Sequence, residues 1–132
     1  MQYEPTLDRA GLIDLAVQRY FANVDAKNME AVLDCFNNEA LFCVQTAFTR
    51  HAGKAEIRRM FEDFFGAWAS IVHKDFTCTV DEVNGRITAA FEAVLTAADG
   101  SQVQFFNTNF WRIRDGRFQE VYVYFSGENV LV

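Results

Sequence analysis

Three Asn-Gly or Asp-Gly dipeptides divide the second half of the chain at nearly even intervals. They are Asn84-Gly85, Asp99-Gly100 and Asp115-Gly116, and long segments rich in β-branched and aromatic residues separate them. Asn, Asp and Gly tolerate the positive φ angles that tight hairpin turns require. The spacing therefore predicts a four-stranded antiparallel meander. Strands of about ten residues are longer than average, so we expect the sheet to curl strongly.

Before the meander, apolar residues recur with the 3.6-residue period of helices. We predict one helix from Leu7 to Asp25, a short one from Met29 to Phe36, and a third from Gly53 to Trp68, with a short strand over 40–45. Three helices on a strongly curled antiparallel sheet predict an α+β fold, a cone with an internal pocket. The apolar stripe of the first helix contains Ile13, Val17, Tyr20 and Val24.

Composition narrows the class of protein. The chain has 132 residues, of which 51% are apolar and 23% charged, and its only proline is Pro5. We therefore expect one globular domain over 1–132, without a linker. The formal net charge of −6 argues against nucleic-acid or anionic-membrane partners, which require clustered Lys and Arg. No leader-like or membrane-spanning apolar run is present, so a cytoplasmic protein is expected.

No sequence motif indicates a metal or a cofactor. Cys35, Cys43 and Cys78 are odd in number and have no metal-ligand spacing, so we expect free thiols. HExxH, CxxC, GxSxG, P-loop and dinucleotide glycine motifs are absent. We therefore expect no metal site and no cofactor.

Two-residue turns would decide which side chains share a face of the meander. They would place Glu92 between Thr77 and Asn107, and Asn109 opposite Ala90. The other face would then be almost entirely apolar, with Phe76, Cys78, Val80, Ile87, Ala89, Phe91, Ala93, Leu95, Phe106 and Phe110. Either this apolar face packs on the helices, or the mixed face lines the pocket and the apolar face forms a homodimer interface.

The order of elements also carries a resemblance. Arg19-Tyr20 and Val24-Asp25 precede MEAVLDCFNNEALF (29–42), and WRIRDGRFQEVYVYFSGENVL (111–131) closes the chain. This pattern resembles the nuclear transport factor 2-like superfamily over roughly 12–130, and within it the ketosteroid isomerases and SnoaL-like polyketide cyclases.

The resemblance implies roles for individual residues. In the isomerases, a Tyr and a protonated Asp hold the developing oxyanion while an Asp base moves a proton. Tyr20 matches the oxyanion tyrosine, and Asn109 matches the protonated acid, where an amide can still donate. The position of the base falls on Val44, which cannot accept a proton.

Other residues would then have to move the proton. With Asn109 in the cavity, the strand pairing brings Asn107 and Glu92 with it, so Glu92 is a candidate acid or base. His73 resembles the histidine that some dehydratases of the superfamily pair with the tyrosine, although a surface position is an alternative. Some of those dehydratases also use an acid one turn after the tyrosine, which matches Asp25, but its place at the end of the helix favours a structural turn role. For His51 we expect an exposed position.

We therefore expect a small hydrophobic carbonyl compound as ligand and catalysis by proton transfer, as in an isomerase, cyclase or dehydratase. The alternatives are a non-catalytic binding or dimerisation domain and a cavity filled by its own phenylalanines. The last strand presents Val121, Val123 and Phe125 to the pocket if its turn is bulged, and Tyr122 and Tyr124 otherwise. The predicted pocket wall is Val24, Phe42, Val44, Phe61, Trp68, Val94, Phe105, Asn107, Trp111, Val121, Val123 and Phe125.

Overall fold

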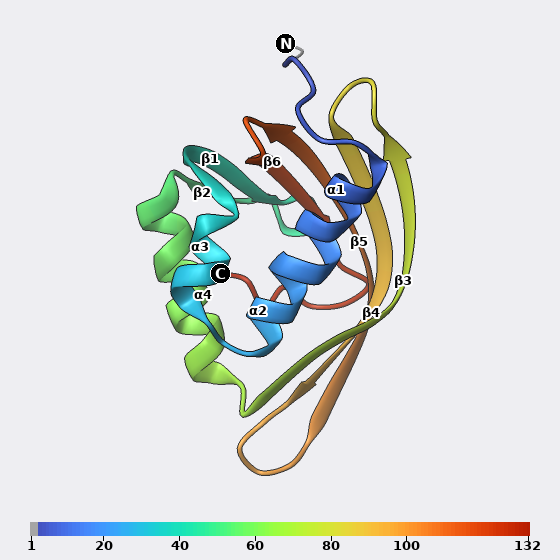
Figure 1. Cartoon of the computed structure of the whole chain (residues 1–132). Coiled ribbons are helices and arrows are strands. Elements are labelled where there is room, and N and C mark those ends of the chain that lie inside the picture. Colours follow the sequence, from blue (N-terminus) through green and yellow to red (C-terminus); the bar gives the residue numbers. More distant parts are fainter. Residues whose placement is uncertain (1–2) are drawn as a thin grey trace.

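In the computed structural model, which describes residues 3–132, six strands form one sheet in the order β2-β1-β6-β5-β4-β3. β1 runs parallel to β6, and all other neighbours are antiparallel. Figure 1 shows β3, β4 and β5 curving around the helices, so the predicted α+β cone is confirmed. The strands are β1 (Phe36–Val44), β2 (Thr49–Ala52), β3 (Ser70–Asp81), β4 (Arg86–Thr96), β5 (Gln102–Arg114) and β6 (Arg117–Tyr124).

The first helix is continuous but changes its pitch in the middle. It consists of α1 (Arg9–Ile13), the π-helical η1 (Asp14–Phe21) and α2 (Ala22–Asp25). Four residues along an α-helix rotate a side chain by about 40° relative to the starting position. The wider π turn cancels this drift. As a result, one buried line recurs every fourth residue, Leu12, Ala16, Tyr20 and Val24, and Leu15 and Phe21 are buried beside it.

The apolar stripe predicted for this helix is partly wrong. Ile13 and Val17 are only half-buried, because the π segment rotates them away from the sheet. At its start the helix is capped by Asp8, whose Oδ1 accepts a hydrogen bond of 2.8 Å from the Gly11 amide.

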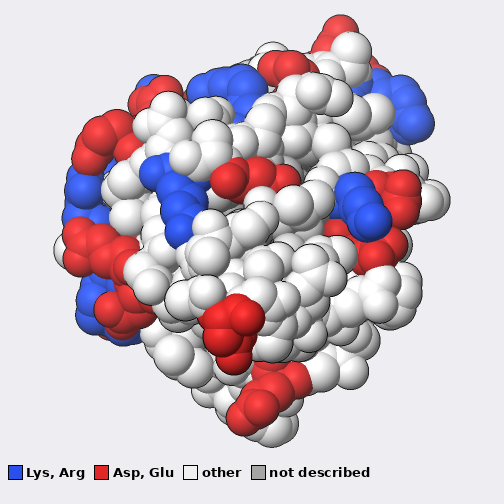
Figure 2. Space-filling model, turned by 90° about the horizontal axis from the view of Figure 1, so that it is seen from below, with Lys and Arg blue, Asp and Glu red and all other residues white. Residues whose placement is uncertain are grey.

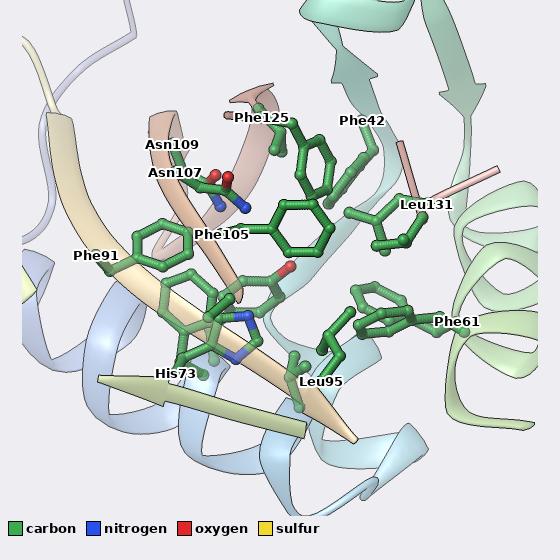
Figure 3. Close-up of a pocket in the computed structure, with 17 residues that line it drawn as sticks. Phe42, Phe61, His73, Phe91, Leu95, Phe105, Asn107, Asn109, Phe125 and Leu131 are labelled. Atoms are coloured by element: carbon green, nitrogen blue, oxygen red, sulfur yellow. The ribbon is translucent and has the colours of Figure 1, made fainter. Parts of the chain in front are cut away.

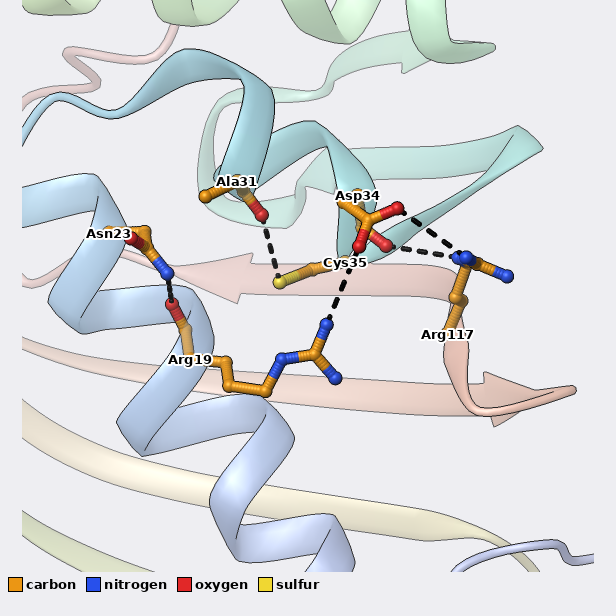
Figure 4. Close-up of polar contacts among 6 residues, drawn as sticks. All are labelled: Arg19, Asn23, Ala31, Asp34, Cys35 and Arg117. Carbon is orange, nitrogen blue, oxygen red and sulfur yellow. Dashed lines mark hydrogen bonds and ion pairs between the residues drawn. The ribbon is translucent and has the colours of Figure 1, made fainter.

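Two shorter helices complete the layer. α3 (Met29–Asp34) ends two residues earlier than predicted, because the chain enters β1 at Phe36, and α4 (Lys54–Ala67) follows β2. Asp34 links α3 to its neighbours through Arg19 of the first helix, at 3.7 Å, and Arg117 of β6, at 3.4 Å (Figure 4). Among residues 3–132, no helix combines the length and apolarity needed to cross a membrane.

The cysteines are unpaired, as predicted. The Cys35 thiol is fully buried behind α3 and donates to the Ala31 carbonyl oxygen (Figure 4). Burial raises its pKa to about 11, so the thiol stays protonated at neutral pH.

The loop between β4 and β5 corrects the predicted pairing. Thr96 pairs with Gln102, and the Ala97 amide donates to the Ser101 carbonyl across a turn that ends in Gly100, with φ of 88°. A two-residue turn at Asp99-Gly100 would pair Glu92 with Asn107, whereas the observed loop pairs Glu92 with Phe106. The register between β4 and β5 therefore differs from the predicted one by one residue. The inner face of β4 therefore carries Ile87, Ala89, Phe91, Ala93 and Leu95, which were predicted to share the opposite face from Asn109.

A β-bulge in β3 decides the orientation of His73. The register with β4 shifts between Lys74 and Thr77, and Asp75 has a positive φ of 57°. His73 consequently pairs with Ala93, whose side chain lies on the inner face. Two-residue turns would place His73 opposite Thr96, on the same face as Glu92, and this expectation from the strand pairing is wrong.

The last hairpin combines the two predicted alternatives. Asp115 and Gly116, with φ of 53° and 73°, form a two-residue turn between Arg114 and Arg117. The register then shifts by one between the turn and Arg112. This irregularity turns Val121 and Val123 inward, as predicted for a bulged hairpin.

Candidate active site

A small cavity lies between the helices and the inner face of the sheet (Figure 3). The space in it that is open to the centre of a water molecule is about 30 Å³, enough for a few waters. Its wall contains seven phenylalanines and only four polar side chains: Tyr20, His73, Asn107 and Asn109. In this conformation, phenyl rings occupy most of the space that a ligand would need.

His73 and Asp25 form a hydrogen-bonded pair at the wall. Asp25 Oδ1 lies 2.5 Å from His73 Nδ1, and Asp25 Oδ2 accepts a 2.8 Å hydrogen bond from the His73 amide. Because a carboxylate only accepts, Nδ1 carries a proton, and in the neutral form of the imidazole Nε2 presents a lone pair. Nε2 has no hydrogen-bond partner among residues 3–132, and the imidazole points into the cavity (Figure 3).

The ring of His73 is held by aromatic neighbours as well as by Asp25. Its centroid lies 4.4 Å from that of Phe21 and 5.5 Å from that of Phe91. The side chain is 9% exposed. Packing on two sides, together with the hydrogen bonds that the ring and the backbone amide of His73 donate to one carboxylate, restricts this imidazole to one orientation.

Tyr20 also lines the cavity, from the π-helical segment. It is 3% exposed, and its hydroxyl has no hydrogen-bond partner in the described part of the chain. Burial is the main cause that raises the pKa of this hydroxyl far above its usual value. Tyr20 therefore remains neutral and can donate a hydrogen bond.

Two amides project from the inner face of β5, and they differ in their partners (Figure 3). Asn107 Oδ1 accepts a 3.1 Å hydrogen bond from the Ser126 amide, so its Nδ2 is the atom left to meet a ligand. Asn109 Oδ1 is buried and has no donor among residues 3–132. Both side chains are at least 95% buried, with exposures of 5% and 3%.

The wall predicted from the sequence is partly present. Three predicted members, Val44, Trp111 and Val121, are buried in the core beyond the cavity. Trp68 lies past the end of α4, where its carbonyl accepts from Lys27. Val94 faces outward because of the β4 register. The predicted members that do line the cavity are Val24, Phe42, Phe61, Phe105, Asn107, Val123 and Phe125.

The predicted position of Glu92 in the cavity is wrong. Glu92 pairs with Phe106 and Lys74 on the outer face of the sheet, because the β4–β5 loop shifts the register by one. Its Oε1 accepts from Gln104 and lies 3.8 Å from Lys74 Nζ.

The expected exposure of His51 is also wrong. It is 3% exposed, because β2 continues the sheet and the C-terminal segment covers it. Arg59 donates to Nδ1 at 3.3 Å, so Nε2 carries the proton and donates to the Leu131 carbonyl at 3.1 Å. Leu131 and Val130 thereby close one side of the cavity.

Several wall residues were not predicted as such. Phe91, Ala93 and Leu95 were assigned to the wrong face of β4, and Phe21 follows Tyr20 within the π segment. Phe64 lies one helical turn after Phe61, a predicted wall residue, on the buried side of α4. Only the irregular C-terminal segment offered no periodic pattern to identify Val130 and Leu131.

The cavity wall presents neither lysine nor arginine to a ligand. No Lys or Arg belongs to its wall among residues 3–132, which also hold no cluster of His, Cys, Asp and Glu that could bind a metal. Seen from below, the surface carries charged side chains most densely along one edge, with wide uncharged areas in the middle (Figure 2).

Comparison with known proteins identifies the family. A sequence model of the SnoaL-like domain matches residues 17–121, which is most of the chain. The chain belongs to the SnoaL-like domain family. As a SnoaL-like protein it is part of the nuclear transport factor 2-like superfamily, as the sequence indicated. The comparison with curated proteins found no match.

Solved structures share the fold of this SnoaL-like protein. A candidate polyketide cyclase from Xanthomonas campestris pv. campestris is 18% identical with a TM-score of 0.78, covering 88% of this chain and 90% of that one. A candidate aromatic ring hydroxylase from Novosphingobium aromaticivorans is 25% identical with a TM-score of 0.76, and the match covers 92% of this chain and 90% of that one. A candidate ketosteroid isomerase from Kribbella flavida is 17% identical with a TM-score of 0.69, and the match covers 91% of this chain and 81% of that one.

Proposed function

We propose that this SnoaL-like protein is an enzyme that needs no cofactor and transfers protons on a small, hydrophobic carbonyl compound, as an isomerase, cyclase or dehydratase. The observation that carries the proposal is the 2.5 Å contact between Asp25 Oδ1 and His73 Nδ1, which leaves Nε2 unpartnered at the cavity. A histidine oriented by a carboxylate is a common general base.

The proposed reaction begins at the carbon next to the carbonyl group. His73 Nε2 removes a proton there, and the electron pair moves to the carbonyl oxygen. Tyr20 and the Nδ2 groups of Asn107 and Asn109 donate hydrogen bonds to that oxygen. One such donor is typically worth about 10²–10³ in rate. The proton then returns to another carbon, or the enolate forms a new bond or expels a leaving group.

His73 would replace the base that the ketosteroid isomerases hold at the position of Val44. Val44 is fully buried and does not line the cavity, so it has no part in the proposal. Asp25 then acts as the residue that orients the base and stabilises its protonated form, not as a structural turn residue.

Exchange of the methyl protons of acetophenone in D2O, followed by proton NMR, tests the proposal without knowledge of the natural substrate. We expect the protein to accelerate exchange, and His73→Gln and Asp25→Asn to reduce the acceleration by about 10²–10⁴. The matched control is Glu92→Gln, which removes a carboxylate on the outer face and should retain the rate. Equal exchange with wild type and His73→Gln would rule out His73 as the base.

A non-catalytic binding domain is the second candidate. The observation in its favour is the cavity volume of about 30 Å³, which phenyl rings such as those of Phe105 and Phe125, 5.3 Å apart, keep small. It predicts that ketones bind while exchange stays at the buffer rate.

We also propose a homodimer through the outer face of the sheet. Large apolar side chains lie exposed there on β3, β5 and β6, and such a surface on a soluble protein favours association. They are Val72, Phe106, Phe110 and Tyr124, exposed by 41% to 65%.

A further inference from the structure

The buried oxygen of Asn109 lacks a donor. Asn109 is 3% exposed and lies between Ala89 of β4 and Val123 of β6 on the inner face. No N–H or O–H group of residues 3–132 reaches its Oδ1. Buried carbonyl oxygens are nearly always hydrogen-bonded, and an unpaired one is costly. Since the side chain lines the cavity, a molecule in the cavity can supply the missing donor.

Asn107 differs from Asn109 because its side-chain oxygen already has a donor. Its oxygen already accepts a hydrogen bond from the Ser126 amide at 3.1 Å, which fixes the side chain and leaves its Nδ2 as the group without a partner in the described part of the chain. Tyr20 provides a second donor in the same cavity. The site thus contains groups that suit a carbonyl oxygen and, two residues along the same strand, an acceptor that suits a hydroxyl.

The charged residues around the cavity narrow the chemical class of the ligand further. The wall has no Lys or Arg among the described residues, and the Asp25 carboxylate lies directly behind His73. A carboxylate or phosphate on the ligand would lose its hydration among seven phenylalanines without gaining a lysine or arginine, and the Asp25 carboxylate behind His73 would repel it. Aromatic walls favour flat, apolar rings instead.

We propose that the cavity is specific for uncharged hydroxy ketones, whose hydroxyl group donates to Asn109 Oδ1 while the carbonyl oxygen accepts from Asn107 and Tyr20. This inference rests on the proposed function for the carbonyl half of the ligand. It assigns the hydroxyl half to Asn109 and leaves the carbonyl oxygen to Asn107 and Tyr20, so that Asn109 determines specificity. Alternate residues of a strand lie about 7 Å apart, which suits a hydroxyl across an aromatic ring from the ketone.

Matched probes test the inference by isothermal titration calorimetry. Acetophenone, 3-hydroxyacetophenone, 4-hydroxyacetophenone and 4-acetylbenzoate share the ketone and differ in one ring substituent. We expect at least one hydroxyacetophenone to bind about tenfold more tightly than acetophenone, the value of one hydrogen bond. We expect 4-acetylbenzoate to bind more weakly than acetophenone.

Substitutions of Asn109 and Asn107 test whether Asn109 causes the preference for a hydroxyl group. In Asn109→Leu the hydroxyl preference should fall to less than about twofold. In Asn107→Leu it should persist, while all the ketones bind more weakly. Thermal unfolding verifies that each variant is folded, and Asn109→Val, which suits a β-strand, replaces Asn109→Leu if that variant fails.

The outcomes separate this inference from the proposed function. Equal binding of acetophenone and both hydroxyacetophenones would overturn the inference, with a resident water satisfying Asn109, and would leave the proposed function intact. A preference that survives in Asn109→Leu would also overturn it. If none of the ketones binds, the proposed function itself fails. A hydroxyl preference without any proton exchange supports the inference and refutes catalysis.

Discussion

The hydroxyl of Tyr20 has no partner although aromatic rings surround the ring that carries it. The Tyr20 centroid lies 4.9 Å from Phe21, 5.2 Å from Phe118 and 6.2 Å from Trp111. These contacts fix the ring and dehydrate its surroundings, and burial raises the pKa of the hydroxyl. At neutral pH the group is therefore a fixed, neutral donor that a ligand can use without reorganisation.

Tyr20 should make the stability of the protein fall at high pH. The unfolded chain ionises a tyrosine near pH 10, while the folded chain keeps Tyr20 protonated because its pKa is raised. Above pH 10 the unfolded state thus binds fewer protons, and the free energy of unfolding decreases by up to about 1.4 kcal/mol per pH unit. This contribution is complete below pH 10 and is lost as the pH rises.

Urea unfolding between pH 9 and 11 measures this effect. Tyr20→Phe lacks the ionisable group, so its stability should fall less steeply over that range. Tyr122, whose pKa is raised to about 12, titrates in both proteins and cancels in the comparison. Identical pH slopes would show that Tyr20 ionises as easily in the folded state as in the unfolded one.

Single-residue irregularities in the strands and loops determine the composition of the cavity. The bulge at Asp75 turns His73 inward, and the β4–β5 loop directs Phe91 inward and Glu92 outward. The π segment of the first helix keeps Tyr20 and Val24 on the buried line. Each irregularity adds or removes one residue of register, so each exchanges one set of side chains for another.

Gly100→Ala should destabilise the protein, while Gly66→Ala should stabilise it. Neither added Cβ meets a heavy atom within 4 Å, so both changes act through the backbone alone. Gly100 has φ of 88°, which costs an L-residue about 1 kcal/mol or more. Gly66 lies in α4, where alanine gains about 0.5–1 kcal/mol. Urea unfolding gives both values, and changes of the same sign would contradict the loop conformation.

The two faces of the curled sheet have different surroundings. Its concave side encloses the cavity with the helices, whereas its convex side exposes Phe106 by 65% and Phe110 by 46%. The outer face also holds an Arg112–Glu120 ion pair of 2.7 Å, to which Tyr122 contributes a hydrogen bond of 2.5 Å. Exposed aromatic rings of this size favour association, which supports the homodimer proposed above.

The double variant Phe106→Glu, Phe110→Glu should be monomeric, because it brings carboxylates together across the proposed interface. Wild type should sediment as a dimer in analytical ultracentrifugation. Val83→Glu is the control, since Val83 is 74% exposed but lies in the turn between β3 and β4. A wild type that is monomeric at every concentration would refute the dimer.

Local patterns in the chain were sufficient for the class of fold and for part of the cavity. Helical periodicity identified α4, and the Asn-Gly and Asp-Gly turns identified the meander, because both signals depend on neighbouring residues alone. The inner face of β5, with Phe105, Asn107 and Asn109, was also predicted in one of the two alternatives. These local patterns predicted the structure correctly because they do not depend on the exact length of a loop.

The partner of His73 required the folded chain. Asp25 and His73 are 48 residues apart, and their contact depends on the pitch of the first helix and on the bulge in β3. Side chains alternate between the faces of a strand with a period of two, so one extra residue in a loop or bulge inverts the face of everything beyond it. For this reason the amino-acid sequence specified a curled sheet with Tyr20 beneath it, whereas the three-dimensional packing selected His73 over Glu92 for the cavity.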